Sequence, residues 1–179
     1  MENYTDEELV KELINGNEKA FDYLYRRYSR KVYSIIARIT KDEDLAEDIM
    51  QEVFVKTYKN IKNFKFKSTF FTWLYRIAVN TALTGLKKKS KLKESELNQE
   101  ILPSESSPDK KLEGEYIKQQ IEAAVDTLPE KQRLIFSLRF YEDLKYSEIA
   151  EITKISLNAC KTNYHYATNA LKEKLGVLI

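Results

Sequence analysis

The chain has 179 residues, of which 42% are hydrophobic and 32% charged, and this is enough for one modest hydrophobic core or two small ones. Four glycines and three prolines are too few for a turn-rich β fold, and no apolar run approaches the roughly 20 residues that a bilayer requires. One cysteine (Cys160) and one histidine (His165) exclude an internal disulfide and argue against a metal centre, while an N-terminus without a basic or apolar segment predicts no secretory signal and a cytoplasmic protein.

Two helices are predicted at the start of the chain. Thr5 and Glu8 have the spacing of a capping box for the first helix, and Gly16 stands where that helix should end. Apolar residues then recur at helical spacing up to Ile39. The second helix is therefore expected to begin with Asn17 as its cap and to end near Ile39.

Two more helices are predicted before the linker segment described below. Leu45, Ile49 and Val53 lie on one helical face and indicate a third helix. A short loop is expected over residues 61–69, followed by a fourth helix over residues 70–86.

A flexible linker is expected over residues 94–115. This segment holds Pro103 and Pro108, several serines and few large apolar residues, and it is acidic. It separates an N-terminal domain of residues 1–93 from a C-terminal domain of residues 116–179.

The C-terminal domain is predicted to end in a helix-turn-helix. After two apolar stripes comes a short helix over residues 148–152 that Ser147 could cap. A tight connection at residues 154–156 leads to a longer helix over residues 157–175, which Gly176 should end. The fold class is therefore all-α, with two small helical domains and a pair of helices of the kind that places its second helix in the major groove.

The net charge of +2 hides a strong partition along the chain. Residues 42–52 hold six acids and no base, whereas residues 53–93 hold eleven bases and no acid. Lysines interspersed with glutamates usually serve only to solvate a helix face, but here the acids are missing. The basic segment is therefore interpreted as a surface for a polyanion such as nucleic acid.

Aromatic residues lie among these bases, at 64, 66, 70, 71, 73 and 75. Rings beside cations suit stacking on unpaired bases. Helical spacing assigns some rings to the core, so the surface role is expected for Phe64, Phe66 and part of Trp73 and Tyr75.

Three sequence motifs, in this order along the chain, are typical of a known family. They are Asp44-Leu-Ala-Glu-Asp-Ile-Met-Gln-Glu-Val-Phe-Val-Lys-Thr-Tyr58, then Phe71-Thr-Trp-Leu-Tyr-Arg-Ile-Ala-Val-Asn80, and Leu128-Pro-Glu-Lys-Gln-Arg133 before the helix-turn-helix. Over nearly its whole length the chain resembles bacterial RNA polymerase sigma factors of the extracytoplasmic-function (ECF) type. The resemblance implies that one domain binds the polymerase clamp and the minus-ten promoter element, and the other binds the flap and the minus-thirty-five element.

The resemblance also implies roles for individual residues. Binding of core polymerase is expected at Asp48, Gln51, Glu52 and Phe54. Contacts to the minus-ten element are expected at Lys56, Phe64, Lys65, Phe66, Ser68, Thr69, Trp73, Tyr75, Arg76 and Asn80. Contacts to the minus-thirty-five element are expected at Ser156, Asn158, Ala159, Lys161, Thr162, Asn163, His165 and Tyr166. An anti-sigma factor is a further expected partner, and no cofactor, metal or small-molecule substrate is implied.

The expected recognition helix departs from the family pattern. Where relatives usually have Gly-Thr-Val-Lys-Ser-Arg, this chain has Asn158-Ala-Cys-Lys-Thr-Asn163. Lys161 and Thr162 match in type, but the usual arginine is missing. Phosphate affinity is therefore expected to be weaker.

Two other functions are alternatives to that of a sigma factor. A stand-alone helix-turn-helix regulator would bind duplex DNA tightly without polymerase, but it needs neither the acidic helix nor the aromatic loop. A nucleic-acid enzyme could hold magnesium with clustered acids. However, the chain has no second acidic cluster, nucleophile elbow or glycine-rich phosphate loop to complete such a site.

Overall fold

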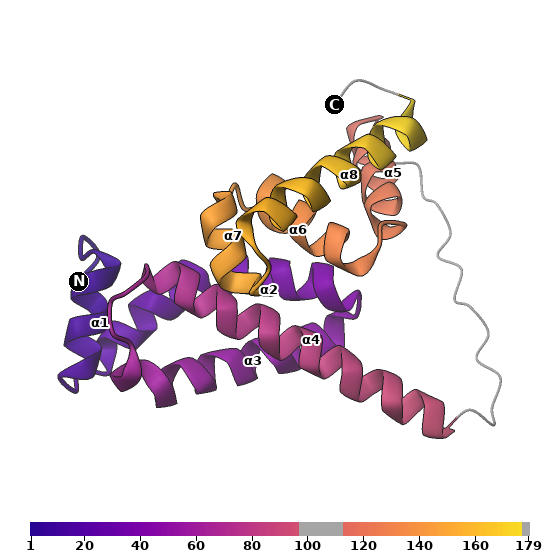
Figure 1. The fold of residues 1–179 in the computed structure, drawn as a ribbon. Helices are drawn as coiled ribbons and strands as arrows, with labels where there is room; N and C mark the ends of the chain where they lie inside the picture. Colours follow the sequence, from indigo (N-terminus) through magenta and orange to yellow (C-terminus); the bar gives the residue numbers. More distant parts are fainter. Residues whose placement is uncertain (97–112, 177–179) are drawn as a thin grey trace. The chain divides into compact units, whose positions relative to one another are not determined.

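Helices make up all the regular structure in the part of the chain that the computed structural model describes, residues 1–96 and 113–176. The elements in chain order are α1 (Asp6–Ile14), α2 (Lys19–Thr40), α3 (Glu43–Asn60), the 3-10 helix η1 (Ile61–Asn63), α4 (Phe70–Glu96), α5 (Glu113–Asp126), α6 (Glu130–Phe140), α7 (Tyr146–Thr153) and α8 (Leu157–Leu175) (Figure 1). The predicted all-α class is confirmed. One compact unit contains α1 to α3, α4 as far as Lys91 and the end of α7 with the residue after it (Glu151–Lys154), and a second contains α5, α6, the start of α7 and α8.

The first helix begins as its sequence predicts. Thr5 Oγ1 accepts a hydrogen bond from Glu8 N at 3.3 Å, and Glu8 Oε2 accepts one from Thr5 N at 2.7 Å, so the capping box is complete. The bond from the Thr5 backbone amide lowers the pKa of Glu8. Gly16, with φ of 95°, follows the end of α1. The predicted cap of the second helix is wrong: α2 begins at Lys19, and the Asn17 amide donates to Glu12 Oε2 at 2.8 Å instead.

The core of the N-terminal unit lies where α2 packs on α1 and α3. Leu24, Ile35 and Ile36 of α2 are fully buried there. Gly85 lets α4 approach the same core, because a Cβ at this position would lie 2.7 Å from Ile49 Cδ1. Any larger residue at Gly85 would force Ile49 to move.

Helix α4 is longer than predicted. It continues through the lysines at 87–89 and past the predicted domain end at 93, as far as Glu96. Long unbranched side chains favour helix, and Lys89 pairs with the Asp42 carboxylate at the start of α3, which ties the basic end of α4 to its own unit. The central part of the expected linker, residues 97–112, lies outside the described residues, and α5 begins before the predicted domain boundary at 116.

The C-terminal unit has its own core between α5, α6 and α8. Its buried members are Ala124, Val125, Leu128, Phe136, Ala167 and Leu171. Pro129 immediately precedes α6, a position that suits a residue without an amide proton.

The helix-turn-helix forms from α7 and α8. Helix α7 begins earlier than predicted, so Ser147 lies inside it and Glu148 Oε2 accepts from Lys145 N at 2.9 Å. Lys154 takes a left-handed conformation, with φ of 62°, in the turn. Ser156 Oγ then accepts from Ala159 N at 3.3 Å and caps α8, which has the predicted bounds and ends at Gly176.

No helix among the described residues combines the length and apolarity needed to cross a membrane.

Candidate nucleic-acid interface

An aromatic cluster fills the loop between η1 and α4. Phe64 is only 6% exposed, and its ring centroid lies 4.9 Å from that of Phe66, 5.3 Å from Trp73 and 6.2 Å from Phe70. Phe66 is different, because it is 41% exposed and its backbone has a positive φ of 55°. This conformation is a strong outlier for a bulky residue, and such strain persists only where the surrounding structure holds it.

Three of the four rings expected at the surface are buried. Phe64 and Trp73 pack against Phe70, while Tyr75 is fully buried with its ring 4.2 Å from that of Phe71. The expectation of a surface role is therefore wrong for Phe64, Trp73 and Tyr75, because burying rings against each other removes much apolar area from water. Only Phe66 offers a large part of its ring to solvent.

Polar and basic residues flank Phe66 along the chain. Lys62 of η1 is exposed, as are Lys65, Lys67 and Thr69 of the loop, and Ser68 is half-buried. Thr69 Oγ1 accepts from Thr72 N at 3.1 Å and so fixes the first turn of α4. Further along that helix, the exposed Asn80 lies one turn beyond the half-buried Arg76 and shares its face.

The acidic face of α3 is exposed as the sequence predicts. Asp48, Gln51 and Glu52 lie at helical spacing on the surface. Phe54 does not share this face: it is 4% exposed, with its ring 4.7 Å from Tyr25. The expectation that Phe54 lies on the binding surface is wrong, because its position on α3 points it into the core.

Lys56 joins the acidic face to α4. Its ammonium lies 2.7 Å from Glu52 Oε1 and 3.3 Å from Thr81 Oγ1. The expected DNA contact of Lys56 would therefore compete with an ion pair inside the protein.

Helix α8 buries one face and exposes the other. Cys160 is fully buried, as predicted for an apolar position. The side chains expected to read DNA and found exposed are Ser156, Asn158, Lys161, Thr162, His165 and Tyr166, whereas Ala159 and Asn163 are half-buried.

Several polar groups of α8 are already bonded within the helix. The Asn163 amide donates to Ala159 O at 2.8 Å, Thr162 Oγ1 donates to Asn158 O at 3.0 Å, and His165 Nε2 lies 3.0 Å from Asn169 Nδ2. Lys161 is exposed, and Tyr166 is 57% exposed.

Two family models match the chain, one in its N-terminal half and one in its C-terminal half. Residues 24–92 match the family Sigma-70 region 2, and residues 118–171 match Sigma-70, region 4. The ECF RNA polymerase sigma-E factor of Escherichia coli K12 is 33% identical over 99% of this chain and 98% of its own length. This chain belongs to the ECF sigma factors. A second relative of this sigma factor, the RNA polymerase sigma-H factor of Pseudomonas aeruginosa, is 30% identical over 97% of this chain and 95% of its own.

Solved structures support the fold of the sigma factor. The sigma factor RpoE of Bartonella quintana, solved with the anti-sigma factor NepR, matches with a TM-score of 0.74 at 21% identity over 89% of this chain and 98% of that one. CnrH, solved with the cytosolic domain of CnrY, matches with a TM-score of 0.71 at 18% identity over 96% and 97%. At these identities the likeness establishes the fold alone.

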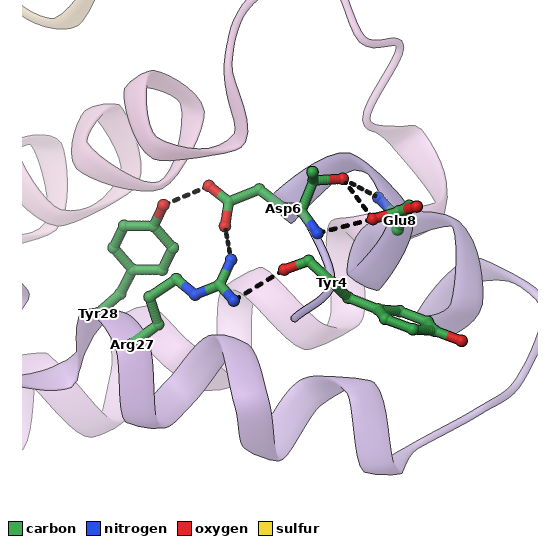
Figure 2. A network of polar contacts seen from close by, with 6 residues as sticks. Tyr4, Asp6, Glu8, Arg27 and Tyr28 are labelled. Atoms are coloured by element: carbon green, nitrogen blue, oxygen red, sulfur yellow. Dashed lines mark hydrogen bonds and ion pairs between the residues drawn. The ribbon is translucent and has the colours of Figure 1, made fainter. Parts of the chain in front are cut away.

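A network of polar contacts fixes α1 of the sigma factor on α2 (Figure 2). The Asp6 carboxylate accepts from Tyr28 Oη and from Arg27 Nη1, the latter at 2.5 Å, and Arg27 Nη2 also donates to Tyr4 O at 2.9 Å. Burial, together with the hydrogen bond to Asp6, raises the pKa of Tyr28.

Sequence reasoning missed one residue that lies beside the Phe66 ring. Lys11 of α1 places its ammonium 5.8 Å from the centroid of the Phe66 ring. The two residues are far apart in sequence, and Lys11 stands in an acidic segment, so neither charge nor motif pointed to it.

Proposed function

We propose that this sigma factor divides promoter recognition between three surfaces: the acidic face of α3 for core polymerase, the Phe66 loop with α4 for the melted minus-ten strand, and α8 for the minus-thirty-five element. The observation that carries the proposal is the exposed Phe66 ring, which lies among lysines in a segment without a single acid. Membership of the ECF sigma family supports transcription initiation at promoters, which requires no catalytic residue of its own.

The acidic face of α3 suits a basic partner surface. Asp48 and Glu52 lie one turn apart with Gln51 between them, and all three side chains are exposed. Complementary charge of this kind speeds association and fixes orientation more than it adds affinity. We propose that this face docks on the polymerase clamp and that the C-terminal unit binds the flap.

The Phe66 loop suits a single strand better than a duplex. A base stacked on an aromatic ring is stabilised by about 1–3 kcal/mol, whereas taking a base out of a duplex costs a few kcal/mol. Stacking on one exposed ring therefore offsets only part of the free-energy cost of local melting. The remainder must come from contacts such as Asn80, whose amide both donates and accepts at a base edge, and from lysines on the backbone.

Helix α8 would read the upstream element from the major groove. Lys161 carries the charge at the start of this helix, and Tyr166 adds an exposed ring five residues later. Because no arginine occupies residues 158–163, we expect fewer phosphate contacts than a basic recognition helix makes.

An anti-sigma factor is also proposed as a partner. The solved neighbours RpoE and CnrH were captured with NepR and with the cytosolic domain of CnrY, respectively. Because this chain has the same fold, a partner of that kind is expected to control it in the cytoplasm, where the polymerase acts.

An open-complex assay with core polymerase tests the proposal. Permanganate footprinting detects unpaired thymines, and Asn80→Ala should reduce their reactivity at the minus-ten element while core binding in a titration stays unchanged. Loss of core binding in this variant would contradict the division into separate surfaces. Tight binding of the wild-type chain to duplex DNA without polymerase would favour the stand-alone regulator instead.

A further inference from the structure

Helix α1 brings a cation to the exposed ring of the loop. The Lys11 ammonium lies 5.8 Å from the Phe66 centroid, within the distance at which a cation is attracted to an aromatic face. The Lys11 side chain is 59% exposed, and its ammonium is 2.6 Å from Glu7 Oε1. In the free protein a neighbouring carboxylate therefore neutralises a charge that remains accessible to solvent.

The position of Lys11 is set by the fold. Asp6 anchors the start of α1 to Tyr28 and Arg27 of α2 (Figure 2). Helix α1 also packs against η1, which leads into the loop. The loop in turn holds Phe66 in its left-handed conformation. Ring and ammonium are therefore held together by two elements that are distant in sequence.

We propose that Lys11 is a further DNA-binding residue, which contacts the phosphate next to the base that stacks on Phe66. The inference rests on the proposed function, because it assumes that this loop holds a single strand. A base stacked on the ring brings its own backbone within reach of a flexible lysine, and lysine binds phosphate as a point charge. The phosphate then replaces Glu7 as the partner of the ammonium.

A second lysine provides a matched control. Lys31 of α2 lies 5.9 Å from the centroid of Phe71, nearly the same geometry as the Lys11–Phe66 pair. Phe71 precedes Asn80 by nine residues, so the two point to opposite sides of α4, since each residue of a helix turns by about 100°. Replacing Lys31 therefore removes one charge from a similar lysine–phenylalanine pair that lies away from the expected path of the DNA strand.

The test compares Lys11→Met with Lys31→Met in the holoenzyme, formed from the full chain and core polymerase. Methionine keeps an unbranched side chain on the ring and removes the charge. The probe is a fluorescently labelled single-stranded DNA carrying the minus-ten sequence of a promoter that the wild-type holoenzyme uses. Its affinity is measured by anisotropy over a series of salt concentrations, with Tm of the free chain as the measure of folding.

Lys11→Met should weaken binding several-fold and make the slope of log K against log salt shallower by about 0.7, the value for one phosphate contact on a single strand. Lys31→Met should leave both unchanged. Wild-type slope and affinity in Lys11→Met would overturn the inference, and so would weaker binding at an unchanged slope with a lower Tm, since that marks a purely structural role. Failure of the wild-type holoenzyme to bind this DNA better than core polymerase alone would refute the proposed function itself.

Discussion

Replacing Phe64 by alanine should destabilise the N-terminal unit much more than replacing Phe66 by alanine. Phe64 is 6% exposed and its ring contacts those of Phe66, Phe70 and Trp73. Removing a buried phenylalanine costs about 3–5 kcal/mol, through lost burial and the cavity left behind. For a unit of this size, each kcal/mol lowers Tm by roughly 4–8 °C, so the loss should be at least about 12 °C.

The change at Phe66 should be mild. Its ring is 41% exposed, and the pair with Lys11 is worth about 0.5–1 kcal/mol at an exposed site. Phe66→Ala should therefore lower the free energy of unfolding by about 1 kcal/mol or less, yet weaken binding of single-stranded DNA by the stacking energy of one base, about 1–3 kcal/mol.

Tryptophan fluorescence reports this unit directly. Trp73 is the only tryptophan of the chain, and its ring lies 5.3 Å from that of Phe64. Urea unfolding followed at this residue gives the free energy of the N-terminal unit for each variant. If Phe64→Ala unfolds at the wild-type urea concentration, or if Phe66→Ala proves the more destabilising change, the assignment of Phe64 to the core and Phe66 to the surface is refuted.

Three further outcomes are expected. The double charge reversal of Asp48 and Glu52 to lysine should lower affinity for core polymerase by about tenfold or more, roughly 1.4 kcal/mol, in a fluorescence titration; unchanged affinity would remove this face from the interface. Lys161→Ala should cost about 1–3 kcal/mol on a promoter with its upstream element and almost nothing on a fragment without it, as measured by transcript yield. Tyr28→Phe should cost about 1.5–3 kcal/mol by losing the hydrogen bond to the Asp6 carboxylate. Because the fold raises the pKa of Tyr28, its contribution is complete below about pH 10 and declines above it, so the wild-type chain should lose more stability than Tyr28→Phe on alkaline titration.

Helix boundaries were predictable where the hydrogen bonds that end the helix involve only residues close by in the sequence. The Thr5–Glu8 capping box and the Gly176 terminus depend on groups within a few residues, and both occur as predicted. Asn17 has a side chain that can cap a helix, but in the structure its amide donates to the Glu12 carboxylate. That contact depends on how the chain turns after α1. In the part of α4 that was not predicted, Lys89 likewise pairs with a carboxylate distant in sequence, that of Asp42 just before α3.

The site was predictable as a segment and less so as individual residues. The absence of acids over residues 53–93 predicts a basic surface from the sequence alone, without knowledge of the fold. Rings spaced by one or two residues along an irregular loop have no periodicity that separates buried from exposed, so Phe64 and Phe66 could be told apart only in the structure. Lys11 reaches Phe66 only because α1 packs beside the loop, a contact that no local pattern encodes.

Run-off transcription tests the central claim most directly. Core polymerase is incubated with a pool of genomic promoter fragments from the host, with and without the purified chain, and the transcripts are sequenced. The account predicts discrete transcripts that require the chain and that disappear when Asn80→Ala is combined with Phe66→Ala. No chain-dependent transcript, together with tight binding of the chain alone to duplex DNA, would contradict it.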